Sequence, residues 1–464
     1  MAGIGFVLRR MADRDDLTGS LAAWGTAAAI TSGPWLMTIT AILLVEHWGV
    51  VHVQPWEHER FRIVLSYNFC FSLVLTAPFA LLATRMAADD IFLRRPEGLS
   101  SGFLTALSGA LAVQALPVLL IWGVLTDLPP QVRVMAIANY TTLVGIWVLL
   151  AYLSVLRDFG LILLSFLMGL GVAAGLGGWI GTGLGAAGLI GSFTLGLAVL
   201  LTLGATRLLV EFPFAPRSWA ETREILQPYI VLAPIGLLTA AAPWVDKWVF
   251  WVSPWAEISS PGLPNLPAYD SAMFLACLAI VPGIALFFVS METEIFAAWR
   301  RFFDRLRGGA SFADLEKMRV GLSGAVARAG GVLLLLQALV AAAAILGGPV
   351  LVEAGLLTAV QQPIFRFGVL GAPFHTLFLA AMIVLAYLDA RRAQLIAAGG
   401  FFLINGLLAA ALLPLGAEWL GYSYFLAAML AAALACMLLA NELRRLIFLV
   451  FIRNNPAVNA AGRA

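Results

Sequence analysis

The sequence predicts an all-α membrane protein with about 12 transmembrane helices in two six-helix bundles. Hydrophobic residues make up 61% of the 464 residues and charged residues only 12%, which leaves too little polar surface for a soluble protein. The apolar residues are grouped in stretches of ~20, the length that crosses the ~30 Å hydrocarbon core. The basic residues are concentrated at alternate ends of these stretches. Together these observations predict a chain that crosses the membrane many times.

Twelve stretches are long and apolar enough to span a bilayer. The predicted spans are 17–45, 61–83, 101–125, 133–156, 159–180 and 188–210 in the first half, and 227–252, 271–291, 329–351, 365–388, 394–415 and 422–443 in the second. The run 17–45 is too long for the apolar core of a cleaved signal peptide, so we take it as a retained span. A polar connector over 211–226 separates a bundle over 1–210 from a bundle over 227–464.

The basic residues orient these spans. If the N-terminus lies in the cytoplasm, 23 of the 28 basic residues fall on the cytoplasmic side. The other five are assigned to the opposite side, namely Arg60, Arg62, Arg133, Lys247 and Arg366. Because basic residues beside the ends of spans are retained in the cytoplasm, both termini are predicted to be inside.

The sequence contains no recognised catalytic or metal-binding motif. No lysine follows a glycine, which excludes a P-loop, and the four histidines lack zinc-ligand spacing. Cys70, Cys277 and Cys436 stand singly in apolar runs and indicate neither a disulfide nor a metal site. The pair Asp89 and Asp90 is interpreted as part of a solvated loop. Because these motifs are missing, we expect no enzyme activity, no cofactor and no metal. The net charge of +2 argues against a nucleic-acid partner.

The strongest candidate site lies in the seventh predicted span, since ionisable residues inside a membrane are costly and often functional. Trp244, Lys247, Trp248 and Trp251 fall near one helical face, so Lys247 can lie over an indole ring. Asp246 is turned by ~100° from Lys247, and we do not expect the two to form an ion pair. Two alternatives remain open: Asp246 faces a central cavity, or both side chains extend to the interface.

A Pro-Trp pair occurs in the first span of each half, at Pro34-Trp35 and at Pro243-Trp244. Interrupted helices at matching positions often mark a transport site. The candidates for the substrate pathway are therefore Trp35, Trp244, Asp246, Lys247, Trp248 and Arg366. Other polar residues in the spans are interpreted as interhelical hydrogen-bond partners: Asn68, Gln114, Asn139, Gln337, Glu353, His375 and Asn405.

The largest cytoplasmic loop, 292–323, predicts an amphipathic helix. Apolar side chains recur at helical spacing from position 295 to 306, with arginines on the other face. Gly308-Gly309 ends this helix, and Ser311 with Asp314 predicts the start of another short helix. The amphipathic helix could lie on anionic lipid or dock a cytoplasmic partner. The docking candidates are Trp299, Arg300, Phe302, Phe303 and Arg305.

Two segments rich in Trp, His and Pro, 46–59 and 253–269, are predicted on the opposite side of the membrane. Aromatic residues at this depth anchor helices at the interface. The alternative is that their rings stack on sugar rings that emerge from the membrane.

Two regions resemble a known family. The opening Met1-Ala-Gly-Ile-Gly-Phe6 with Leu8-Arg-Arg-Met11, and the loop residues Arg301-Phe302-Phe303, resemble the PelG family of inner-membrane transporters of Pel exopolysaccharide systems. The resemblance implies a fold like that of the MOP flippase superfamily and export of a galactosamine-containing polysaccharide through the bacterial inner membrane. It also implies a cytoplasmic glycosyltransferase (PelF-like), a cyclic-di-GMP receptor (PelD-like) and a small membrane subunit (PelE-like) as partners.

The leading hypothesis is therefore a translocation pathway for a polysaccharide during its synthesis. One alternative is an ion-coupled exporter of small molecules, in which Asp246 would carry a proton. Another is a membrane scaffold that recruits a synthase without transporting the polymer.

Overall fold

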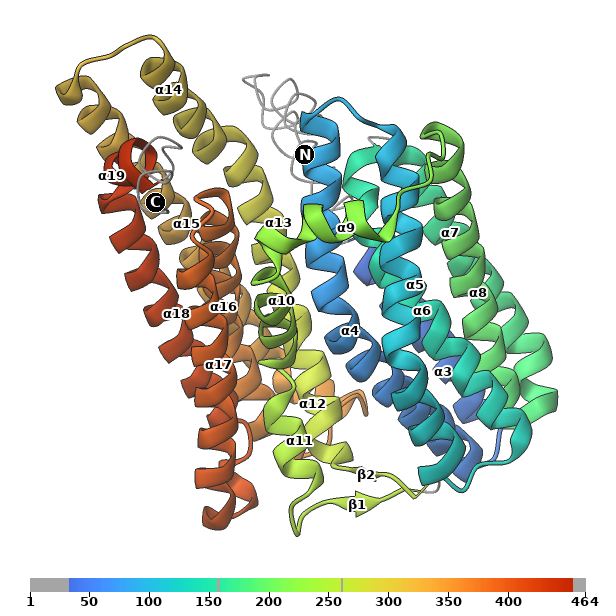
Figure 1. The fold of residues 1–464 in the computed structure, drawn as a ribbon. Helices are drawn as coiled ribbons and strands as arrows, with labels where there is room; N and C mark the ends of the chain where they lie inside the picture. Colours follow the sequence, from blue (N-terminus) through green and yellow to red (C-terminus); the bar gives the residue numbers. More distant parts are fainter. Residues whose placement is uncertain (1–32, 157–158, 260–261, 454–464) are drawn as a thin grey trace. The chain divides into compact units, whose positions relative to one another are not determined.

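The computed structural model describes residues 33–156, 159–259 and 262–453, which are almost entirely helical (Figure 1). Within them the chain forms two compact units, 33–267 and 268–453. Among the described residues, ten helices are long and apolar enough to cross a membrane, or eleven if a pair bent by 64° counts as one span. The prediction of an all-α membrane fold is confirmed. The count of twelve spans and the orientation remain predictions.

The first unit is built around α4. Its elements are α3 (Gly33–His52), α4 (Pro55–Phe92), α5 (Glu97–Leu119), η1 (Leu120–Leu125), α6 (Pro130–Leu156), α7 (Phe159–Leu176), η2 (Gly177–Gly181), α8 (Thr182–Glu211), α9 (Trp219–Leu226), η3 (Gln227–Tyr229), α10 (Leu232–Ala241), α11 (Val245–Trp251), β1 (Glu257–Ile258) and β2 (Pro264–Asn265). The strands pair antiparallel, which the sequence did not predict. Helix α4 packs against α5, α6, α8 and α10, so it is the central helix of the unit.

Two glycines show how closely the helices of this unit approach. A Cβ on Gly236 of α10 would lie 2.7 Å from the carbonyl oxygen of Ala77 in α4. Gly185 has a φ of +59° inside α8, and the amide that follows it, of Ala186, donates to Oε2 of Glu57 at 2.9 Å. A side chain at position 236 would obstruct the contact with α4, and a residue other than glycine at position 185 would strain the backbone there.

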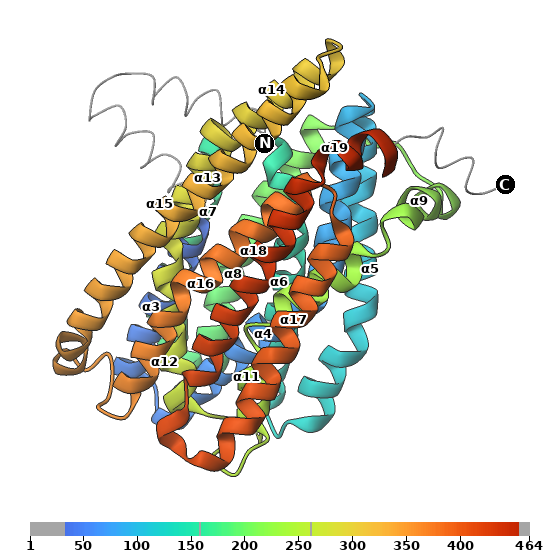
Figure 2. The same ribbon diagram turned by 90° about the vertical axis from the view of Figure 1, so that its left-hand side faces the viewer.

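The second unit contains the remaining helices. Its elements are α12 (Pro267–Cys277), η4 (Leu278–Ile280), α13 (Val281–Ser290), η5 (Met291–Ile295), α14 (Phe296–Arg307), α15 (Phe312–Glu353), α16 (Gln361–Tyr387), α17 (Arg391–Leu412), η6 (Leu413–Leu415), η7 (Ala417–Trp419), α18 (Tyr422–Arg444), α19 (Leu446–Phe448) and η8 (Leu449–Arg453). Both α16 and α17 pack on α18 (Figure 2). Five alanines of α18 between Ala427 and Ala435 are at most 1% exposed, and such small residues allow close helix packing.

The loop 292–323 is a helical hairpin of α14 and the beginning of α15. Helix α14 ends at Gly308, and Gly309 has a φ of +70°, as the glycine pair predicted. The Ser311 hydroxyl accepts the amide of Asp314 at 3.2 Å, which confirms the predicted cap. The prediction of a short second helix is wrong, because α15 continues for 42 residues. No proline interrupts it before Pro349, so the capped turn runs directly into the span.

The seventh predicted span, 227–252, is broken twice. It contains η3, α10 and α11, with a bend of 64° between Ala220–Tyr229 and Leu232–Ala241 and a turn at 242–244. Because α10 packs on α4, these helices belong to the compact unit 33–267. The division into halves at the connector 211–226 follows the pattern of spans and stays a prediction.

Candidate substrate site

The candidate site forms where Pro243 interrupts the helix between α10 and α11. Proline has no amide hydrogen and obstructs the preceding turn, so the helix restarts at Val245. The first amides of a helix lack partners inside it. The amide of Lys247 donates to Oδ1 of Asp246 at 2.9 Å, and the Lys247 ammonium donates to the Pro243 carbonyl at 3.1 Å. The break therefore supplies the backbone groups that hold both charged side chains.

Asp246 and Lys247 also form an ion pair, with Nζ 3.8 Å from Oδ1. The prediction that these neighbours would not pair is wrong. The angle of ~100° separates the directions of their Cβ atoms, but the carboxylate folds back to the helix start and the lysine side chain is long. Asp246 is fully buried and the Lys247 side chain is 9% exposed. The Lys247 ammonium lies 5.3 Å from the Trp244 ring centroid, as the sequence predicted.

Aromatic side chains of α4 pack against the tryptophans of α11. The rings of Phe71 and Trp248 are parallel, with centroids 6.0 Å apart, and the Trp248 indole donates to Sγ of Cys70 at 3.3 Å. Tyr67 stacks on Trp251 with centroids 4.7 Å apart. Trp248 keeps part of its surface exposed, whereas Trp251 is buried. Sequence reasoning missed these α4 residues, although the aromatic run Tyr67-Asn-Phe-Cys-Phe71 was a signal for them.

The neighbouring polar residues of the first unit are satisfied by each other. Asn68 donates to Oδ1 of Asn139 at 2.9 Å and accepts the Trp122 indole hydrogen at 2.9 Å. Gln114 accepts the Tyr140 hydroxyl at 2.8 Å. These residues are fully or nearly fully buried, and hydrogen bonding is required of buried polar groups. The interpretation of Asn68, Asn139 and Gln114 as interhelical hydrogen-bond partners is confirmed.

The other polar candidates lie in the second unit. Nδ1 of His375 lies 2.7 Å from the Tyr424 hydroxyl, and Gln337 donates to the carbonyl of Ile280 at 3.3 Å, so both connect helices as predicted. Arg366 is exposed on α16. Trp35 lies in the first turn of α3, but its side chain is outside the part that the structure describes.

The arginine-rich face of α14 is exposed, but its apolar face is largely used by the fold. Arg300 and Arg305 are exposed, whereas Phe302 is fully buried. Trp299 packs on Phe303 with centroids 4.6 Å apart, and both keep partial exposure. Phe302 cannot dock a partner in this conformation, because its side chain is fully buried. The amphipathic pattern identified the helix correctly but could not identify what covers its apolar face.

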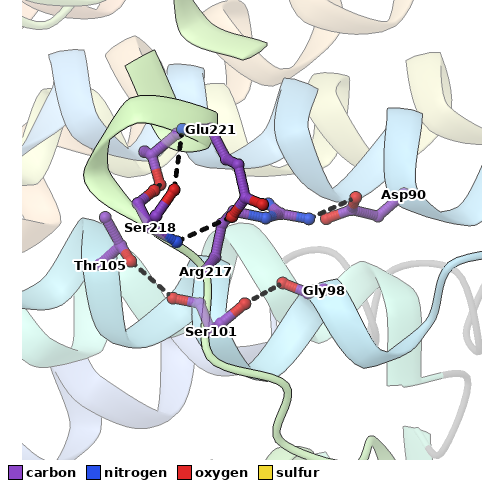
Figure 3. Close-up of polar contacts among 8 residues, drawn as sticks. Asp90, Gly98, Ser101, Thr105, Arg217, Ser218 and Glu221 are labelled. Carbon is purple, nitrogen blue, oxygen red and sulfur yellow. Dashed lines mark hydrogen bonds and ion pairs between the residues drawn. The ribbon is translucent and has the colours of Figure 1, made fainter. Parts of the chain in front are cut away.

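A second polar cluster lies at the end of α4, where the sequence predicted only a solvated loop (Figure 3). Asp90 is 5% exposed and accepts a hydrogen bond from Arg217 of the connector at 2.9 Å. Ser100 of α5 donates to the carbonyl of Phe212 at 2.7 Å. The solvated-loop interpretation is therefore wrong for Asp90. Its partner lies 127 residues away, so no local pattern could reveal it.

The described residues contain no cluster of metal-ligand side chains. Across 33–156, 159–259 and 262–453, no three His, Cys, Asp or Glu residues gather closely enough to hold an ion. The three cysteines all lie in this part of the chain, where none of them forms a disulfide bond.

The fold is similar to that of solved MATE and MOP superfamily transporters. The chain is similar to a MATE transporter in complex with MaL6, with a TM-score of 0.63, 15% identity and coverage of 90% of this chain and 96% of that one. It is also similar to a MOP superfamily transporter from Pyrococcus furiosus (TM-score 0.61, 16% identity, 90% and 96% coverage). An inward-facing multidrug resistance MATE transporter gives a TM-score of 0.58 at 16% identity, covering 87% and 95%.

Sequence comparison identifies the family of the chain. The model of the putative exopolysaccharide exporters, PelG (EPS-E), matches residues 1–451. The chain belongs to this family, which confirms the resemblance seen in the sequence. No curated protein matches the chain significantly.

Proposed function

We propose that the protein moves a Pel-like, galactosamine-containing polysaccharide across the bacterial inner membrane while it is synthesised, with both termini in the cytoplasm. Membership of an exopolysaccharide exporter family and the MOP transporter fold support transport of a polymer. The identity of the polymer rests on the family resemblance alone.

One observation supports the first unit as the place of substrate contact. The broken helix at Pro243 combines an acid, Asp246, with the partly exposed indoles of Trp244 and Trp248. Indole faces attract apolar sugar faces and also attract cations. A polymer with protonated amino groups would find both kinds of surface here, and its amine could take the place of the Lys247 ammonium over Trp244.

Secretion by cells that carry substituted exporters tests this assignment. We expect W248A to lower the secreted polymer by roughly two- to tenfold, the range for losing one aromatic contact. The matched control is W179A, which removes an exposed tryptophan of η2 outside the cluster. Equal secretion by W248A and W179A at equal protein level would exclude Trp248 from the pathway.

An ion-coupled small-molecule exporter is the second candidate, because a carboxylate as fully buried as that of Asp246 can serve as a proton carrier in a membrane. Reconstituted protein discriminates between the two functions. Small-molecule transport that needs a proton gradient and is lost in D246N would favour this candidate. Polymer translocation without such dependence would favour polysaccharide export.

The partners remain those that the family resemblance implies, namely a cytoplasmic glycosyltransferase, a cyclic-di-GMP receptor and a small membrane subunit. We propose that the exposed Arg300 and Arg305 of α14 contribute to docking them, with Trp299 and Phe303 beside them. A charge reversal, R300E/R305E, should reduce co-purification of the partners from native membranes. K317E changes an exposed charge on α15 and is the control.

The scaffold alternative predicts a different combination of results. If the protein only recruits a synthase, R300E/R305E abolishes secretion while W248A leaves it unchanged. If it forms the pathway, W248A reduces secretion although the partners still co-purify.

A further inference from the structure

A groove of about 440 Å³ lies between α5 and the connector that follows α8. Its volume falls within the range of small-molecule sites. Helix α5 contributes three hydroxyl residues and three leucines, and the connector contributes the rest. The lining residues are Ser101, Leu104, Thr105, Leu107, Ser108, Leu111, Phe214, Pro216 and Arg217. Arg217 is the only charged residue among them.

Arg217 is held in place by Asp90 (Figure 3). Nη2 of Arg217 donates to Oδ1 of Asp90 at 2.9 Å, and Asp90 is not among the residues that line the groove. A Cβ on Gly98 would lie 2.7 Å from Oδ2 of Asp90 and would also meet Nη2 of Arg217. The glycine therefore makes room for the pair. Asp90 orients the guanidinium without placing its own negative charge in the groove.

Arg217 is the strongest hydrogen-bond donor among the residues that line the groove. Nη1 of Arg217 is buried and has no hydrogen-bond partner among the described residues. The hydroxyls of Ser101, Thr105 and Ser108 donate to helix carbonyls, of Gly98, Ser101 and Thr105 respectively. Their hydrogens are thus already used. A sugar chain needs several donors and acceptors, so this lining favours a ligand with a single anionic group.

The rest of the lining is apolar and reaches the surface. Leu104 is 39% exposed and Phe214 is 59% exposed, and α5 belongs to an apolar span, Glu97–Leu125. The leucines at positions 104, 107 and 111 follow helical spacing, so they form one apolar strip. Such a strip suits an acyl chain, and an arginine at the end of a span suits a headgroup phosphate.

We propose that this groove binds an anionic phospholipid, with its phosphate on Arg217 and an acyl chain along the leucine strip of α5. The bound lipid would join α5 to the connector. The protein itself already holds the connector in place through the ion pair of Asp90 with Arg217 and through the hydrogen bond from Ser100 to the carbonyl of Phe212. The site is independent of the substrate cluster at Pro243.

Native mass spectrometry of the purified full chain tests the proposal, with phosphatidylglycerol and phosphatidylcholine as competing probes. We expect the wild type to prefer phosphatidylglycerol, and R217Q to lose about tenfold in its affinity, because a charge-assisted hydrogen bond contributes on that order. R223Q removes an exposed arginine of α9 and should bind as the wild type does.

R217Q also breaks the contact with Asp90, so a second variant that keeps this ion pair intact is needed. S108W places an indole in the groove and should reduce phosphatidylglycerol binding while leaving the Asp90 pair in place. Equal binding of the two lipids by the wild type, or equal affinities of R217Q and R223Q for phosphatidylglycerol, would overturn the proposal. It also fails if inorganic phosphate alone binds in an Arg217-dependent manner and S108W has no effect on lipid binding.

Discussion

The first unit contains two buried acid–base pairs that arise in opposite ways. Asp246 and Lys247 are neighbours in the chain, and the backbone of one broken helix supports both. Asp90 and Arg217 are 127 residues apart, and only the packing of the connector on α4 and α5 brings them together. The first pair has alternative partners within one turn, including the Pro243 carbonyl and the Trp244 ring. The second pair depends on its two members and on the space left by Gly98.

This difference predicts how the stability of each pair responds to substitution. Removing one member of a buried pair is costly when it leaves a charge without compensation. The Lys247 ammonium retains two favourable contacts when Asp246 is lost. For Arg217, the described residues provide no other carboxylate contact. The long-range pair should therefore be the more sensitive of the two.

The largest effect is expected from D90A, which leaves Arg217 largely buried without its anion. We expect a loss of about 3 kcal/mol in the free energy of unfolding, measured in detergent by denaturant titration. The control R207A breaks an exposed pair with Glu211 and should cost less than about 1 kcal/mol. The double variant D90A/R217A should recover part of the loss. If D90A lowered the free energy of unfolding no more than R207A does, burial of the Asp90–Arg217 pair would not increase the contribution of that pair to stability.

The next effect is expected from G98A, because the new methyl group would meet both members of the pair. Overpacking of this kind costs about 1–3 kcal/mol, observable as a lower unfolding midpoint. The control is G171A on α7, where a Cβ has open space. Since alanine favours helices over glycine by up to ~1 kcal/mol, G171A should be neutral or stabilising. Equal behaviour of the two variants would contradict the close approach at Gly98.

A smaller effect is expected from D246N. The amide oxygen of asparagine can still accept the Lys247 amide, and the ammonium keeps the Pro243 carbonyl. We expect a loss of about 1 kcal/mol in the free energy of unfolding, clearly below that of D90A. A loss equal to that of D90A would refute the idea that local backbone contacts compensate for the loss of the Asp246 charge.

The smallest effect concerns Glu221, which caps α9 next to the long-range pair. The Ser218 amide and hydroxyl hold the pKa of the exposed Glu221 carboxyl below its ordinary value. A lowered pKa in the folded state means that the stabilisation is present above the unfolded pKa and disappears as the pH falls through the folded pKa. Hydrogen exchange of α9 should therefore accelerate on acidification, after correction for its intrinsic pH dependence. E221Q should remove this acid-dependent change, and a change that persists in E221Q would assign it to another group.

The fold could be predicted to a large extent because its signals are local. Apolar stretches located the helices, since each must cover the hydrocarbon core by itself. The cap at Ser311 and the end at Gly308 also depend on residues within one turn. The same applies to the contact of Lys247 with Trp244, which helical spacing predicted.

The candidate sites were predicted less completely. The side chains of Asp246 and Lys247 were expected to point in different directions, as those of adjacent helical residues do. They form an ion pair instead, because both fold back toward the start of the helix. Phe302 was assigned to a docking surface, but its side chain is fully buried. The rings of Tyr67 and Phe71 went unnoticed because their partners lie on α11, far away in the chain.

The sequence by itself determined that this protein is a helical membrane protein of the exopolysaccharide exporter family, and that Pro243 interrupts the seventh predicted span. Only the tertiary structure decided that Asp90 meets Arg217, that α4 supplies rings to the tryptophans of α11, and that a groove opens beside α5. The physical reason is the range of the interactions. Capping, helix breaking and burial in lipid act within a turn or along one helix, whereas pairing across many residues depends on which helices pack together.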